Sequence, residues 1–132
     1  MPLLNDATIP DSARLFRVLI PNWVIKSGET RRVASCAFFE VRGEVSLFLD
    51  APGLLEELRR IFPGREIASV SAMVIREAGL AIERRPTECP SDFRCDNACH
   101  VVVGPAQELS RNEMERRYRS IAKHPALVIL PG

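Results

Sequence analysis

Short apolar runs separated by proline and glycine dominate the sequence and predict several strands. Residues 33–40 and 45–50 alternate between apolar and polar positions, with a turn around Gly43 between them. This alternation predicts a β-hairpin, because successive side chains on a strand point to opposite faces. The other runs that predict strands are residues 13–20 (a strand or a short helix), 66–72, 80–86, 99–105 and 126–130. The last run is apolar throughout, so we expect it to be buried on both faces.

Two segments show the three- and four-residue spacing of apolar positions that is typical of amphipathic helices. Residues 51–62 form the first, with Asp50 as the expected N-cap. Residues 109–125 form the second, and Ser110 begins a capping-box pattern there. A further helix of one or two turns fits the segment that ends at Gly79.

The order of these elements, roughly β-ββ-α-β-(α)-β-β-α-β, predicts the fold class. We expect one α+β domain over residues 1–132, with a mixed sheet of about five to seven strands and two or three helices packed against it. A chain of 132 residues suits one domain with a core of its own. Residues 1–12 are polar and contain two prolines, which predicts a flexible arm or loop.

Composition narrows the class of protein. Apolar residues make up 46% and charged residues 27% of the chain, which argues against disorder. A formal net charge of +1 provides no basic field for nucleic acid. No apolar run approaches the roughly 18 residues of a membrane helix. Four cysteines without a secretory leader favour a reducing compartment, so we expect a cytoplasmic protein. The excess of Arg over Lys, 16 against 2, indicates a GC-rich and presumed bacterial gene.

Three cysteines precede or begin the valine-rich strand and are of the type that binds zinc. Three residues separate Cys95 from Cys99, as in known zinc sites, but five separate Cys89 from Cys95. If the strand begins at residue 99, Cys99 and His100 point to opposite faces and cannot both reach one ion. We therefore predict no metal and no cofactor, and keep Cys89, Cys95 and Cys99 as weak candidates for a zinc site.

Polar side chains on or beside the predicted strands are the candidates for chemistry. His100 begins a strand directly after a polar loop, and Ser35 lies within the first strand of the predicted hairpin. These two are the candidate catalytic residues. Arg17 and Arg32 are the candidates for binding an anion, because guanidinium groups bind phosphate and carboxylate in a forked geometry. The structural alternatives are a hydrogen bond between His100 and a loop carbonyl, and ion pairs for the arginines.

Two resemblances to known families bear on these residues. Residues 31–38 and 97–104 resemble the R-R-x-x-S-x-A-F and N-x-x-H-x-x-V-x-G segments of a family of short bacterial proteins of unknown function. That resemblance extends from about residue 15 onward, implies no activity, and adds Asn97 to the candidate binding residues. The second resemblance is to ADP-ribosyltransferase-like domains, in which Arg17 and Ser35 would match residues that hold the dinucleotide. The late catalytic glutamate of that family has no clear counterpart here.

The sequence lacks the P-loop and the G-x-G-x-x-G, H-E-x-x-H and G-x-S-x-G motifs of common enzymes. We therefore expect a small binding or accessory module that acts with a partner protein, and leave homo-oligomer formation open. The first alternative is an enzyme on a nucleotide-type or other anionic substrate, whose four candidate residues Arg17, Arg32, Ser35 and His100 should converge on one cleft. The second alternative is a zinc-stabilised module.

Overall fold

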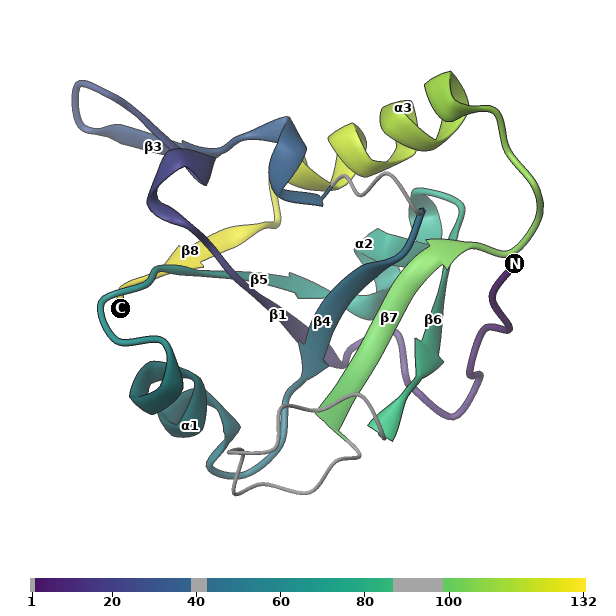
Figure 1. Ribbon diagram of the computed structural model, residues 1–132, viewed down its shortest axis with the longest axis horizontal. Helices are drawn as coiled ribbons and strands as arrows, with labels where there is room; N and C mark the ends of the chain where they lie inside the picture. Colours follow the sequence, from purple (N-terminus) through teal and green to yellow (C-terminus); the bar gives the residue numbers. More distant parts are fainter. Residues whose placement is uncertain (1, 39–42, 87–98) are drawn as a thin grey trace.

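The computed structural model describes residues 2–38, 43–86 and 99–132, and it contains one six-stranded sheet with the strand order β6-β7-β4-β1-β5-β8 (Figure 1). The strands are β1 (Arg14–Val18), β4 (Val45–Leu49), β5 (Ile67–Ser71), β6 (Leu80–Arg84), β7 (His100–Pro105) and β8 (Val128–Leu130). Each pairing between these strands is antiparallel. A separate hairpin consists of β2 (Val24–Ser27) and β3 (Thr30–Val33).

The described residues also form three α-helices: α1 (Leu54–Ile61), α2 (Ala72–Glu77) and α3 (Arg111–Ala122). Two short 3₁₀ helices, η1 (Pro21–Trp23) and η2 (Ser35–Phe38), flank the hairpin. The predicted α+β fold class is confirmed. No helix within the described part of the chain is long and apolar enough to cross a lipid bilayer.

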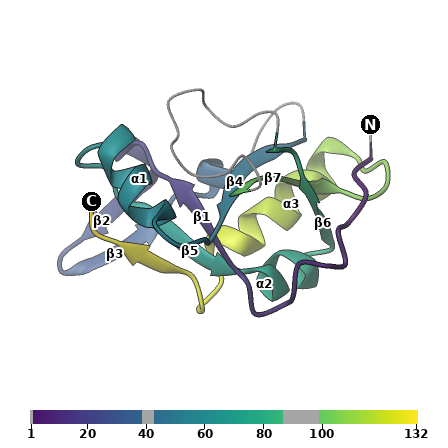
Figure 2. The same ribbon diagram turned by 90° about the horizontal axis from the view of Figure 1, so that it is seen from below.

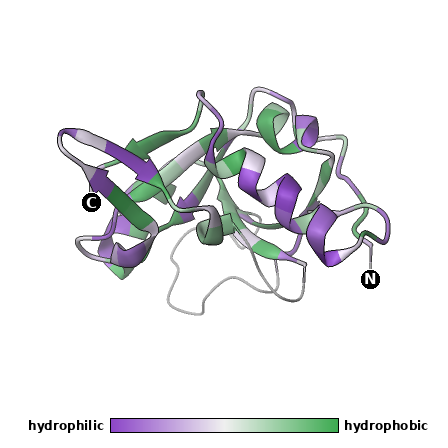
Figure 3. Ribbon diagram, turned by 90° about the horizontal axis from the view of Figure 1, so that it is seen from above, coloured by the Kyte–Doolittle hydropathy of each residue, from purple (hydrophilic) through white to green (hydrophobic). Residues whose placement is uncertain are grey.

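The sheet has a hydrophobic cluster on each face. Leu15, Leu47 and Val101 point to the face that α2, α3 and η2 cover, where Tyr118 of α3 is fully buried. Phe16 and Phe48 point to the other face and pack with residues of α1. The helices α1 and α3 accordingly lie on opposite sides of the sheet (Figure 1). Along its length α3 alternates between hydrophilic and hydrophobic stretches, as expected for a helix with one face on the core (Figure 3).

The hairpin predicted from residues 33–40 and 45–50 is wrong. β3 ends at Val33 and pairs with β2, and η2 follows it, while β4 pairs with β1 and β7. A 3₁₀ turn allows the adjacent Ala37 and Phe38 both to be buried, at 0% and 1% exposure. A strand would have sent one of these two side chains to the opposite face. Residues 39 and 40 of the predicted strand lie outside the described residues.

The helix caps agree with the sequence at one helix and differ at another. Ser110 caps α3, and its Oγ accepts a hydrogen bond of 3.1 Å from the N–H of Glu113, as predicted. Asp50 does not cap α1, whose N-cap is Gly53 with a φ of 79°. The N–H of Asp50 instead bonds to the carbonyl of Arg14, which ends β4 beside β1.

The last strand, β8, is an edge strand and is not buried on both faces as predicted. It pairs only with β5 among the described residues. Val128 is 49% exposed, and Ile129 and Leu130 are half-buried. The apolar run belongs to a strand at the margin of the sheet that is only partly buried. The sequence of the run alone does not distinguish such an edge strand from a central strand.

The opposite margin of the sheet, β6, is covered by residues 2–12, which contain no helix or strand (Figure 2). The carbonyl of Ile82 accepts a 2.8 Å hydrogen bond from the N–H of Asp6. The N–H of Ile82 donates to Oδ1 of Asn5 at 3.2 Å. Arg76 of α2 also binds Oδ1 of Asn5, the carbonyl of Asp6 and a carboxylate oxygen of Asp11. The N-terminal segment therefore satisfies the outward-facing backbone groups at Ile82.

Candidate ligand-binding site

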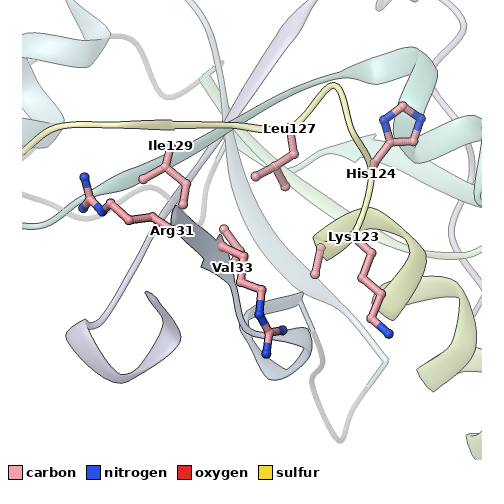
Figure 4. Close-up of a pocket in the computed structure, with 8 residues that line it drawn as sticks. Arg31, Val33, Lys123, His124, Leu127 and Ile129 are labelled. Atoms are coloured by element: carbon pink, nitrogen blue, oxygen red, sulfur yellow. The ribbon is translucent and has the colours of Figure 1, made fainter. Parts of the chain in front are cut away.

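A pocket of about 580 Å³ opens between the hairpin, the C-terminal end of α3 and β8 (Figure 4). We call it the basic pocket. Its lining consists of Arg31, Arg32, Val33, Ala122, Lys123, His124, Leu127 and Ile129. The volume falls in the range of about 300–1,000 Å³ that is typical of small-ligand sites.

The floor of the basic pocket is aliphatic. Val33 and Ala122 are buried in the core, and Leu127 and Ile129 pack against it while remaining half-buried. Figure 4 shows Leu127 and Ile129 extending from the last segment of the chain toward β3. A turn after α3, in which the N–H of Leu127 donates to the carbonyl of His124 at 3.1 Å, places these side chains there.

Two of the four basic groups at the rim are bound to carboxylates of the protein. Arg31 forms an ion pair with Glu66. His124 points toward α2 (Figure 4), and its Nε2 lies 3.7 Å from a carboxylate oxygen of Glu77. Its Nδ1 accepts a hydrogen bond of 3.0 Å from the N–H of Ala126, so in the neutral ring Nε2 carries the proton.

The other two basic groups, Arg32 and Lys123, are exposed and have no hydrogen-bond or ion-pair partner in the part of the chain that the structure describes. Lys123 is the C-cap of α3, where the negative end of the helix dipole lies. That dipole disfavours an anion, but it is equivalent to only about half an elementary charge, and the full positive charge of Lys123 opposes it. The rim therefore presents two free cations beside an aliphatic floor.

Arg17, a predicted anion-binding residue, is bound to the protein's own backbone. Its Nε donates to the carbonyl of Ala37 at 3.0 Å, and its Nη1 donates to the carbonyl of Ser46 at 2.9 Å. Its guanidinium also stacks over the Trp23 ring, 5.0 Å from the centroid. These contacts tie η2, which begins at Ser35, to the sheet.

His100, the predicted catalytic histidine, is 3% exposed on the other side of the sheet. Its Nδ1 lies 2.9 Å from the carbonyl of Arg85, which is the structural alternative weighed from the sequence. The ring meets Phe48 edge-on, at 5.8 Å between centroids and 66° between planes. Phe48 belongs to the cluster beneath α1, whereas Val33 of the basic pocket belongs to the cluster beneath α3. The structure therefore does not bring His100 and Arg32 to one pocket.

The remaining candidates are the metal-type residues and Asn97. Cys89, Cys95 and Asn97 lie outside the described residues. Cys99 is buried, precedes β7 and packs in the same cluster as Phe48. The argument that Cys99 and His100 diverge along a strand thus does not apply, because β7 begins only at His100. Within the described ranges, no group of three His, Cys, Asp or Glu side chains is placed to hold a metal ion.

Sequence reasoning missed Lys123, His124, Leu127 and Ile129 as site residues. The sequence pattern predicts that Lys123 is one of several charged residues on the solvent-exposed side of α3. It predicts that Leu127 and Ile129 are core residues. The basic pairs 31–32 and 123–124 are visible in the sequence, but their approach depends on where the hairpin docks.

A comparison of the chain with models of protein families finds no match, and neither does a comparison with curated proteins or with solved structures. The two family resemblances stay predictions, and an assignment of function rests on the geometry of this chain.

Proposed function

We propose that the protein is a binding module that acts with a partner protein, and that the basic pocket receives a short acidic and aliphatic segment of that partner. The observation that carries this proposal is a pair of cations, Arg32 and Lys123, whose side chains have no partner among the described residues and lie beside an aliphatic floor. Carboxylates of the ligand would lie at the rim, and its aliphatic side chains would cover Leu127 and Ile129.

The character of the lining favours a peptide over a nucleotide. Among the described residues, the lining of the basic pocket includes no Phe, Tyr or Trp side chain on which a base could stack, and the ring of His124 points toward α2. Trp23 stacks with Arg17 and is not part of the lining. Aliphatic side chains such as valine or leucine, in contrast, are stabilised when they move from water onto an aliphatic surface of this kind.

The catalytic alternative receives less support from the geometry. Arg17 holds backbone carbonyls, and His100 lies beneath the α1 side of the sheet. Of the four residues named for that activity, only Arg32 lines the basic pocket. A binding function requires only the cations and the floor.

The proposal is tested by fluorescence polarisation with a fluorescein-labelled peptide, Glu-Ser-Val-Ser-Glu. Two control peptides separate the two contributions: Lys-Ser-Val-Ser-Lys reverses the charge, and Glu-Ser-Gly-Ser-Glu removes the aliphatic group. We expect only the first peptide to bind, with an affinity that decreases as salt is added. Binding of the first peptide no tighter than that of both controls would refute the proposal.

Protein variants locate the binding. The double variant R32E/K123E should weaken the complex roughly tenfold, since each exposed ion pair is worth about 0.2–1 kcal/mol and reversal adds repulsion. Arg111→Glu is the matched control for each of the single variants Arg32→Glu and Lys123→Glu, because it makes the same charge change at the N-terminal end of α3, away from the pocket, where an acidic residue is compatible with the helix dipole. Equal loss in the single variants and the control would place the binding elsewhere.

A further inference from the structure

The backbone of β8 offers hydrogen-bonding groups to the basic pocket. In an antiparallel ladder, opposed residues alternate between pairs that exchange both backbone hydrogen bonds and pairs that exchange none. The register between β1 and β5, together with the hydrogen bonds from the N–H of Ala72 to Ala13 and from the N–H of Leu19 to Glu66, determines this alternation. Residues 66, 68, 70 and 72 direct their backbone groups toward β1. Ile67 and Ser69 therefore direct theirs toward β8.

The alternation continues into β8. Ile67 is opposite Leu130 and Ser69 is opposite Val128, so these are the hydrogen-bonded pairs. Ile129 lies between them and directs its N–H and C=O away from β5. Neither group has a hydrogen-bond partner among the residues that the structure describes. Ile129 also lines the basic pocket, so its side chain and its free backbone groups belong to one site.

The hairpin presents a second free strand edge to the same pocket. The N–H of Ala34 donates to the carbonyl of Trp23 at 2.7 Å, which makes this pair and the pair of Ile25 with Arg32 the hydrogen-bonded ones. Arg31 and Val33 consequently direct their backbone groups away from β2, and both residues line the basic pocket. Figure 4 shows β3 and β8 on facing sides of this space.

The two edge strands of the sheet differ in whether described residues bond to their outward backbone groups. At β6, Asn5 and Asp6 bond to the N–H and the carbonyl of Ile82, as described above. At β8, no described residue does the same for Ile129. Exposed strand edges are templates for pairing with another chain, and proteins commonly cover those that are not used.

We propose that the partner segment binds in extended form as an added strand on β8, exchanging backbone hydrogen bonds with Ile129. This inference rests on the proposed function and specifies how the segment is held. Side chains of a strand alternate between its faces, so only every second residue of the segment enters the basic pocket. An aliphatic residue there packs on Leu127 and Ile129, and acidic residues two positions before and after it reach Arg32 and Lys123 at the rim.

The sharpest test is the variant Ile129→Pro. Proline removes the outward N–H but no hydrogen bond to β5, and proline is tolerated in edge strands when its nitrogen faces outward. Ile129→Ala is the matched control for the lost side chain. We expect Ile129→Pro to bind the Glu-Ser-Val-Ser-Glu peptide roughly tenfold more weakly than Ile129→Ala, because a carbonyl of the peptide is left unpaired. Equal affinities of the two variants would overturn the strand-addition proposal.

A second measurement does not depend on the folding of the proline variant. Wild-type protein is titrated with versions of the peptide that carry a single N-methyl group on each amide in turn. At least one position should weaken binding about tenfold, because that amide donates to the carbonyl of Ile129. Uniform tolerance of methylation would refute strand addition while leaving the basic pocket as the peptide site. Failure of the unmodified peptide to bind would refute the proposed function itself.

Discussion

Replacing Arg17 with methionine distinguishes a structural arginine from an anion-binding one. The side chain joins η2 to the sheet through the carbonyls of Ala37 and Ser46 and stacks over Trp23. Methionine retains part of the aliphatic packing of the stem but donates no hydrogen bond. The variant therefore removes these polar contacts without replacing a residue that lines the basic pocket.

The expected loss follows from the contacts. Two hydrogen bonds from a charged donor are worth about 1–2 kcal/mol each when partly exposed, although part of this is regained by hydration of the freed carbonyls. The cation–π contact adds about 0.5 kcal/mol. We therefore expect the free energy of unfolding to fall by about 2–3 kcal/mol. For a chain of this length, such a loss lowers Tm by roughly 5–10 °C.

Urea unfolding measures this loss. Fluorescence of Trp23, the only tryptophan, reports on the hairpin, and circular dichroism serves as an independent probe because Arg17 itself contacts that ring. Arg32→Met is the control, and as an exposed substitution it should change stability by less than about 0.5 kcal/mol. Wild-type stability of Arg17→Met combined with loss of peptide binding would refute the structural role and restore the anion-binding interpretation.

Two further predictions concern stability. Tyr118→Phe should cost about 1–3 kcal/mol in a thermal melt, because the buried hydroxyl donates to the carbonyl of Gly43 and lies 3.2 Å from that of Val103; an unchanged Tm would contradict this. The Glu83 pKa is lowered from its ordinary 4.5, first by the hydrogen bond from the N–H of Leu4 and also by Arg85. Its contribution to stability is therefore full above pH 4.5 and is lost as the pH falls through the lower folded value. In urea titrations at successive pH values, Glu83→Gln should reduce the decrease in the free energy of unfolding that accompanies acidification. Part of that decrease should remain, because the pKa values of Asp6 and Glu113 are also lowered, by Thr8 and Arg116 respectively. An unchanged decrease would show that the Leu4 contact does not form in solution.

The sequence predicts the elements of this fold well where side-chain pattern and local chemistry agree. Ser110 is such a case, because a cap depends on residues three positions apart. The alternating pattern gave a wrong prediction at residues 35–38, which form the 3₁₀ helix η2 and not a strand. The adjacent Ala37 and Phe38 are both buried, which a 3₁₀ turn allows and a strand does not. Only the position of η2 against the core shows that both are buried, and the sequence does not give that position.

The candidate site was less predictable, since its parts come from distant segments. Arg32 was selected from the sequence, but Lys123 and Ile129 join it only because the hairpin lies beside the end of α3. The free backbone groups of Ile129 depend on sheet order and register, which no local pattern encodes. Sequence reasoning offered a loop carbonyl as the structural partner of His100, but it could not show that this carbonyl belongs to Arg85.

The N-terminal segment over β6 limits how copies of this protein can associate. A sheet with two open margins can add neighbours without end and grow into a fibre. Here Asn5 and Asp6 of the chain itself bond to the outward backbone groups of Ile82 at one margin, which disfavours head-to-tail growth from margin to margin. Edge-to-edge association through β8 would therefore stop at a symmetric pair, and that pair would compete directly with the partner segment for the same strand.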